Sequence, residues 1–182
     1  MLLNTPLCDF GWQAVNFTLK DPTGRSFEMK DYLGDNGLLI AFICNHCPYV
    51  KAIGERFAQD TNDLMAEGIN VIAVMSNDYH HVTADSPENM IRFADNYGFK
   101  FPYLIDENQS VGKAYGAVCT PDFFGFNKGG GLQYRGRLDN ANMKNTTERS
   151  KELVTAMRQI AATGKGPTEQ FASMGCSIKW NE

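Results

Sequence analysis

The sequence has no broad excess of positive charge. Its 17 lysines and arginines are outnumbered by 21 aspartates and glutamates, which gives a net charge of −4 and a pI near 5.4. Positive charge supplies most of the non-specific attraction to nucleic acids and to anionic membranes. We therefore expect neither of them as a partner.

Long hydrophobic runs are also missing. The longest apolar stretch, residues 38–44, is far short of the roughly 20 residues that cross a bilayer. The first twenty residues lack a basic leader followed by a continuous apolar segment, so they do not resemble a secretory signal. We expect no transmembrane helix and a cytoplasmic location.

Cysteine is scarce, with five in 182 residues. An odd and sparse set of cysteines argues against a disulfide scaffold and favours specific thiol chemistry. We find no internal repeat, low-complexity segment or linker, and predict a single domain over residues 1–182, with its core at about 10–163 and a tail at about 164–182. The cysteines are Cys8, Cys44, Cys47, Cys119 and Cys176.

A strand, a helix and a second strand are predicted in the first half of the chain. Residues 38–43 are continuously apolar, as in a strand buried on both faces of a parallel sheet. The helix is predicted to begin at Pro48, which suits a first helical position, and to stop at Gly68. Residues 70–75 repeat the buried-strand pattern, and a right-handed crossover would place them parallel to the first strand.

The same alternation continues toward the carboxyl terminus. Ser86 is predicted to cap a helix that begins at Pro87 and ends before Gly98. The remaining predictions are a short strand at 101–106, a short helix at 110–115, an antiparallel hairpin of 123–126 with 132–137, and a last helix at about 147–163.

These elements predict an α/β fold with a central mixed β-sheet flanked by helices, an N-terminal β extension and a C-terminal tail. From residue 165 the tail is expected to be irregular. Its Ile178 and Trp180 nevertheless indicate that its end docks on the domain, because a solvated tail has little use for such side chains.

Cys44 and Cys47 form a Cys-x-x-Cys motif between the first buried strand and the first helix. The helix amino terminus offers unpaired N–H groups and the positive end of its dipole, which favour the thiolate form. The two-residue spacing lets the second thiol attack a mixed disulfide formed by the first. His46, between them, would stabilise a thiolate further and make the disulfide more oxidising.

Other interpretations of the pair stay open at this point. It could be half of a structural zinc site or two inert buried cysteines, although a zinc site usually needs a second ligand pair, and the sequence shows none at a similar spacing. Thr120-Pro121 gives separate support for redox chemistry, because a cis X-Pro bond there could form a tight turn facing the thiols. A trans turn proline is the alternative. We predict no metal.

The order of strand, CNHCP, helix, βα units and TPDFFGF resembles the thioredoxin-like superfamily, in the branch of alkyl hydroperoxide reductase and thiol-specific antioxidant proteins, over about residues 10–163. The segments CNHCPYVKAI, SPENM, AYGAVCTPDFFGF, YRGRLD and GCSIKW are similar to a group of bacterial thioredoxin-family proteins with this CNHCP motif. The resemblance implies a thioredoxin-like fold, a cis Pro121, and binding of a substrate's extended backbone by Thr120 and Pro121.

Departures from the better-known members separate two mechanisms. The motif lacks the Trp-Cys-Gly-Pro-Cys form of thioredoxin, and Cys44 stands where peroxiredoxins usually have a threonine three residues before their peroxide-attacking cysteine. By resemblance, thioredoxin-type exchange would use Cys44 first, whereas a peroxidase would use Cys47.

Three more residues are candidates for accessory roles. Cys119, just before Thr120, could exchange with the pair or be buried as a small apolar residue. Cys176 could fold back as a resolving thiol or cross-link two subunits. Arg137, with Arg135 beside it, could stabilise a thiolate as an arginine does in peroxiredoxins, or be solvated.

The sequence thus predicts a thiol–disulfide oxidoreductase that uses Cys44 and Cys47 on a protein or small-molecule disulfide, with a thiol reductant system as partner. No cofactor beyond the cysteine pair is expected, and no phosphate-binding glycine pattern implies a nucleotide. One alternative is a thiol peroxidase with Cys47 as the peroxidatic cysteine. Another is a non-catalytic or metal-binding module, with the metal at Cys44, Cys47 and Cys119. The sequence is compatible with an oligomer.

Overall fold

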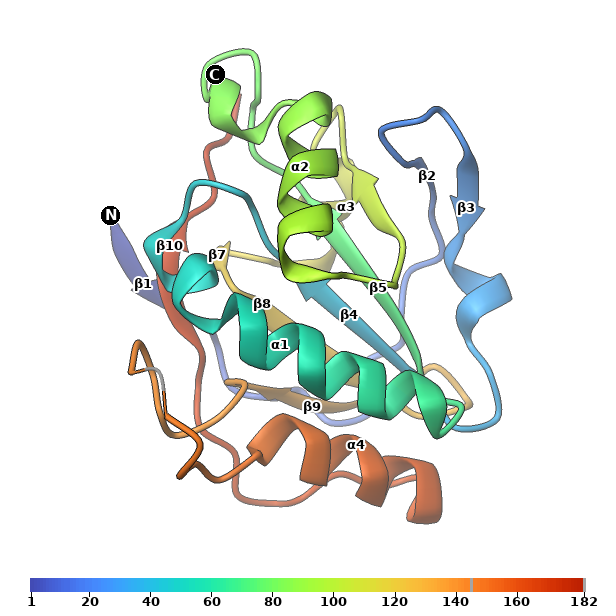
Figure 1. The fold of residues 1–182 in the computed structure, drawn as a ribbon. Coiled ribbons are helices and arrows are strands. Elements are labelled where there is room, and N and C mark those ends of the chain that lie inside the picture. The colour runs from blue at the N-terminus through green and yellow to red at the C-terminus, as the bar shows by residue number, and fades with distance from the viewer. Residues whose placement is uncertain (145, 182) are drawn as a thin grey trace.

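The computed structural model describes residues 1–144 and 146–181, in which ten strands form two sheets and four α-helices pack against the larger one (Figure 1). Two short 3-10 helices lie at Met29–Tyr32 and Thr83–Asp85. The α-helices are α1 (Pro48–Ala66), α2 (Pro87–Tyr97), α3 (Ser110–Tyr115) and α4 (Glu152–Thr163). The strands are β1 (Leu2–Asn4), β2 (Thr18–Lys20), β3 (Ser26–Glu28), β4 (Leu38–Phe42), β5 (Asn70–Met75), β6 (Tyr103–Ile105), β7 (Cys119–Thr120), β8 (Asp122–Phe126), β9 (Leu132–Gly136) and β10 (Met174–Ser177).

The central sheet has the strand order β3-β2-β6-β5-β4-β8-β9. Strands β4, β5 and β6 are parallel, and the outer strands join them in antiparallel pairs. The β4–α1–β5 unit confirms the predicted βαβ arrangement, with Leu38 opposite Asn70. The predicted fold class, a mixed sheet flanked by helices with additional N-terminal strands, is confirmed.

Both faces of the sheet are covered, which explains why the central strands read as unbroken apolar runs. On one face, Leu39 and Ala41 of β4 pack in the cluster that includes the buried sides of α1, α2 and α4. On the other, Leu38, Ile40 and Phe42 pack with α3 and the N-terminal segment. Figure 1 shows α1 in front of the sheet and α3 behind it.

The last helix begins at Glu152, so its predicted start at about 147 was wrong. The Arg149 side chain points into the interior instead. Its guanidinium donates hydrogen bonds to Asp60 at 2.7 and 2.8 Å and to Asp139 at 3.1 Å. These buried ion pairs hold residues 147–151 in a non-helical path. The helix ends as predicted at Gly164, in the left-handed conformation that glycine favours.

The tail is irregular only in part, which corrects a second prediction. Its residues Met174–Ser177 form β10, the middle strand of a small antiparallel sheet with the order β1-β10-β7. Gly175 permits this packing, because a Cβ atom there would lie 1.8 Å from the Thr120 carbonyl oxygen. The end of the tail docks as expected, with Ile178 buried in the second core cluster.

Across the described residues, no helix combines the length and the apolar character needed to cross a membrane.

Candidate functional site

The two cysteines of the motif lie where β4 ends and α1 begins, as predicted. Cys47 is the N-cap residue of α1, and Pro48 takes the first helical position. Both side chains face Thr120, whose peptide bond to Pro121 is cis. Cys44 Sγ lies 3.3 Å from Thr120 Oγ1, and Cys47 Sγ lies 3.4 Å from the Thr120 carbonyl oxygen. Cys44 is only 1% exposed and Cys47 is fully buried.

The surroundings of the two thiols differ, and they drive the two pKa values apart. A hydrogen bond from Cys44 lowers the pKa of Cys47; burial opposes this, and the backbone N–H groups of Cys176 and Val50 assist it. The same hydrogen bond raises the pKa of Cys44, and burial and the nearby Asp85 carboxylate raise it further. The surroundings therefore favour loss of a proton from Cys47 over loss of one from Cys44.

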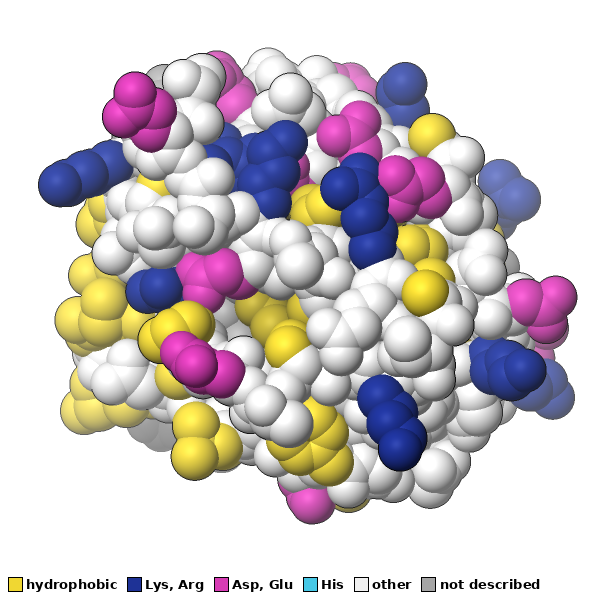
Figure 2. Space-filling view, turned by 90° about the horizontal axis from the view of Figure 1, so that it is seen from below, with side chains coloured by type: hydrophobic (Ala, Val, Ile, Leu, Met, Phe, Trp, Pro, Cys, Tyr) yellow, Lys and Arg dark blue, Asp and Glu magenta, His cyan; other side chains and the backbone are white. Residues whose placement is uncertain are grey.

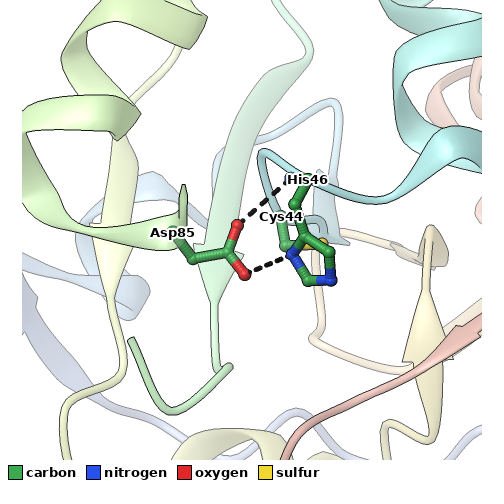
Figure 3. A group of neighbouring side chains, drawn as sticks. All are labelled: Cys44, His46 and Asp85. Carbon is green, nitrogen blue, oxygen red and sulfur yellow. Dashed lines mark hydrogen bonds and ion pairs between the residues drawn. The ribbon is translucent and has the colours of Figure 1, made fainter. Parts of the chain in front are cut away.

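Asp85 organises the motif from the loop that follows β5 (Figure 3). Its Oδ1 accepts hydrogen bonds from the backbone N–H groups of Asn45, at 2.7 Å, and His46, at 3.2 Å. Its Oδ2 lies 2.6 Å from His46 Nδ1 and accepts from Asn77 Nδ2 at 2.9 Å. Burial alone would raise the pKa of this carboxyl, but the bonds from His46 and Asn77 outweigh burial and lower it. Asp85 thus fixes both the backbone of the motif and the ring of His46.

Asn45 is held on its other side by Tyr103. The Tyr103 hydroxyl donates to Asn45 Oδ1 at 2.8 Å, and Asn45 Nδ2 donates to the Ala84 carbonyl at 3.1 Å. Burial, with the nearby Cys44 and Asp85, raises the pKa of Tyr103 well above its usual range, so its hydroxyl stays a donor. Every polar group of the Asn45 side chain that faces the interior therefore has a partner.

Cys44, His46 and Asp85 bring one potential metal ligand each to within 4.8 Å of one another. Both oxygens of Asp85 already accept hydrogen bonds from protein donors, however. A cation would have to displace at least one of these donors to use the carboxylate. This arrangement fits a carboxylate that positions the motif better than one built as a ligand.

The other candidate residues from the sequence are buried or already paired with a charged partner. Cys119 is buried in β7, and burial raises its pKa to about 12, so it is protonated at neutral pH. Arg137 Nε donates to Glu152 Oε1 at 2.8 Å and its guanidinium lies over Phe171, so its charge is already paired. Arg135 is paired with the buried Asp122.

Cys176 comes to the pair from the opposite end of the sequence. In β10 it stands directly across from Thr120, so the edge of β7 beside the cis proline is occupied by the protein's own strand. Its side chain is partly exposed and packs against the cluster that contains Cys44 and Cys47. The thiols of Cys44, Cys47 and Cys176 therefore lie in or against one hydrophobic cluster.

Sequence reasoning missed Asp85, Asn45 and Tyr103. A usable signal existed for Asp85, because the loops after two adjacent parallel strands, here β4 and β5, meet at one edge of the sheet. Asp85 and the CNHC motif lie in those two loops. Tyr103 was assigned to a strand correctly, but its partner depends on the register of β6 against β5, which local patterns do not give.

Comparisons with known proteins found relatives in sequence and in structure. Over 112 residues the chain is 33% identical to the thiol-disulfide oxidoreductase ResA of Halalkalibacterium halodurans, covering 61% of this chain and 58% of ResA, so it spans somewhat more than half of that relative's length. A conserved protein of Geobacillus kaustophilus is 38% identical over 100% of this chain and 97% of its own, with a TM-score of 0.92.

The thioredoxin domain of a thiol-disulfide oxidoreductase from Bacteroides vulgatus matches with a TM-score of 0.64 over 84% of this chain and 97% of its own. At 15% identity this likeness shows the fold alone, and it confirms the thioredoxin-like prediction. The family model described as "AhpC/TSA family" matches residues 10–136. This match covers more than half of the chain, and the chain belongs to the AhpC/TSA family.

Proposed function

We propose that the protein is a thiol–disulfide oxidoreductase whose working groups are Cys44 and Cys47. The observation that carries this proposal is the pair itself, two hydrogen-bonded thiols at a helix amino terminus with pKa values shifted in opposite directions. A thiolate beside a protonated thiol is the state from which exchange starts. The relationship to ResA supports the same activity.

The reaction is a two-electron transfer to a disulfide. The resemblance to thioredoxin implied Cys44 as the first nucleophile, but the lowered pKa of Cys47 favours its thiolate instead. The Cys47 thiolate attacks one sulfur of the substrate, the substrate's S–S bond breaks, and one substrate thiolate leaves. Cys44 then gives up its proton and attacks the Cys47 sulfur of the mixed disulfide. The Cys44–Cys47 bond forms, the second substrate thiol is released, and a thiol reductant restores the pair.

A cavity beside the cis proline is a candidate place for the rest of the substrate. It measures about 160 Å³, and its lining includes Tyr49, Pro121, Met143 and Met174. The lower face of the molecule mixes acidic and basic side chains around exposed hydrophobic groups (Figure 2). Such a surface suits a substrate with apolar parts better than a strongly charged one.

The test follows the reaction of the reduced protein with a model disulfide by mass mapping. Wild type should accumulate a Cys44–Cys47 disulfide, Cys47→Ser should lose the fast reaction, and Cys44→Ser should react with the substrate but fail to close the pair. Cys8→Ser is the matched control, since Cys8 packs in the other core cluster. Fast reaction of Cys47→Ser at Cys44 would refute Cys47 as the nucleophile, and no reaction in wild type would refute the activity.

A thiol peroxidase is the second candidate, because the thiolate is on Cys47 rather than Cys44. Cys47 would attack the peroxide, release an alcohol or water, and leave a sulfenic acid that Cys44 converts to the disulfide with loss of water. The arginine expected to assist, Arg137, is paired with Glu152, which favours disulfide exchange. Rapid, Cys47-dependent consumption of hydrogen peroxide by the same variants would instead establish peroxidase activity.

A further inference from the structure

The Cys44–Cys47 pair is almost inaccessible from solvent, whereas Cys176 is partly exposed. Cys44 is 1% exposed and Cys47 is fully buried, so an external thiol reaches either sulfur of their disulfide slowly. Cys176 packs against the hydrophobic cluster that contains both cysteines of the pair. Among the cysteines in or against this cluster, Cys176 is the one that also reaches the surface.

The fold holds Cys176 in this place by its backbone on both sides. Cys176 is paired with Thr120 of β7 on one edge and with Leu2 of β1 on the other. Its neighbour Gly175 lets β10 approach the Thr120 carbonyl more closely than any side chain would allow. Thr120, which pairs with Cys176, accepts a hydrogen bond from Cys47 Sγ at 3.4 Å through its carbonyl oxygen. Cys176 therefore lies directly across from Thr120, the residue that both thiols of the pair contact.

We propose that Cys176 is a third redox thiol, which forms a disulfide with Cys47 and carries disulfide exchange between the buried pair and solvent. This proposal rests on the proposed function, because it needs the Cys44–Cys47 disulfide to form. It adds a more exposed sulfur at which an external thiol can reduce the protein.

The internal step needs no external oxidant. The Cys176 thiolate attacks the Cys47 sulfur of the Cys44–Cys47 disulfide, that bond breaks, the Cys47–Cys176 bond forms, and Cys44 leaves as a thiolate. Cys44 then takes up a proton in place of the one Cys176 lost, and the number of disulfides is unchanged. Electrons have moved only between the protein's own sulfurs.

An external thiol completes the cycle at the exposed sulfur. It attacks Cys176, and Cys47 leaves as the thiolate that its surroundings stabilise, since a thiol of low pKa leaves fastest. A second external thiol attacks the external sulfur of the resulting mixed disulfide, releasing Cys176 and a small-molecule disulfide. Two thiols are oxidised, and the protein gains two electrons.

The charges around Cys176 favour this order of steps. Burial raises its pKa first, and the Cys47 thiolate raises it further by hydrogen bonding and by charge, while Lys179 lowers it. Once Cys47 is bound in the disulfide with Cys44, its negative charge is gone. The Cys176 thiol then ionises more easily at the stage when it has to attack.

The test uses the full chain and oxidised glutathione as the probe. In Cys44→Ser, oxidation should give a Cys47–Cys176 disulfide, identified by peptide mapping after trapping the free thiols. In Cys176→Ser, the Cys44–Cys47 disulfide should still form, but its reduction by glutathione should slow roughly tenfold or more, because the attack must then occur at a buried sulfur. Cys8→Ser should be reduced at the wild-type rate.

The outcomes separate this proposal from the proposed function. Absence of a Cys47–Cys176 bond in Cys44→Ser, or a wild-type reduction rate in Cys176→Ser, overturns the role of Cys176. Failure of the wild-type protein to form the Cys44–Cys47 bond overturns the proposed function instead. Cys176→Ala separates the loss of the thiol from a disturbed β10, when its thermal unfolding is compared with that of wild type in the reduced state. Slow reduction of the disulfide in a variant of wild-type stability supports the proposal. Slow reduction that appears only together with a loss of stability overturns it.

Discussion

Replacing Asp85 should disorganise the cysteine motif without removing any sulfur. The carboxylate is fully buried and accepts four hydrogen bonds, from the backbone of Asn45 and His46 and from the side chains of His46 and Asn77. In Asp85→Ala all four donors lose their acceptor. A hydrogen bond to a charged group contributes about 1.5–3 kcal/mol, but partial hydration through the exposed side of His46 reduces the sum, so we expect a loss of about 3–5 kcal/mol.

Asp85→Asn is the conservative control, and its expected cost follows from which oxygen each donor uses. Oδ1 receives the two backbone N–H groups, so an amide oxygen placed there keeps both bonds in weaker, neutral form. The amide nitrogen then faces Asn77 Nδ2, and two donors meet. We expect a loss of about 1.5–3 kcal/mol, between wild type and Asp85→Ala.

The assay is urea unfolding of the reduced proteins, repeated at decreasing pH. The pKa of Asp85 is below its usual value in the folded state, so its contribution is complete above the unfolded pKa of about 3.9 and is lost as the pH falls through the folded pKa. The difference between wild type and Asp85→Asn should therefore shrink in acid. Equal stabilities of wild type and Asp85→Ala at neutral pH, or a difference that grows in acid, would refute the reasoning.

Three further predictions concern the same region. The ultraviolet absorbance of a thiolate should persist in the reduced protein well below the ordinary cysteine pKa of about 8.5 and disappear only as the pH falls through the lowered pKa of Cys47. This absorbance should be absent in Cys47→Ser. A titration near the ordinary value would contradict the assignment of the thiolate to Cys47. Gly175→Ala should cost about 1–3 kcal/mol by displacing β10 and should speed the alkylation of Cys47, and an unchanged alkylation rate would show that β10 does not limit access. Tyr103→Phe should lose about 1 kcal/mol, measured by urea unfolding, through the missing bond to Asn45, and a neutral effect would mean that water replaces the hydroxyl.

The sequence predicted the central part of the fold because that part is encoded locally. The apolar runs of β4 and β5, the proline at the start of α1 and the Ser86 cap of α2 are each visible within a few neighbouring residues. In the structure Ser86 Oγ accepts from the Asn89 N–H, as a helix cap should. The motif itself was predicted for the same reason, because its thiols and its place between strand and helix are adjacent in the chain.

The parts that were not predicted depend on partners that are distant in the sequence. Residues Met174–Ser177 form a strand only because β1, at the other end of the chain, and β7 each supply an edge. Likewise, residues 147–151 avoid a helix because Asp60, in α1, binds Arg149. No propensity within either segment carries this information, so single-sequence patterns could not supply it.

The site also combines residues that are adjacent in the sequence with residues that are distant in it. The reactive sulfurs of the motif come from one local segment, but what sets their reactivity comes from three others: Asp85 after β5, Thr120 in β7 and Cys176 in β10. Asp85 raises the pKa of Cys44, whereas the Cys176 N–H lowers that of Cys47. The largest effect on both pKa values is the hydrogen bond between Cys44 and Cys47, and these distant groups add to it. Because the orientation of that bond depends on the folded chain, the sequence left the two mechanisms open.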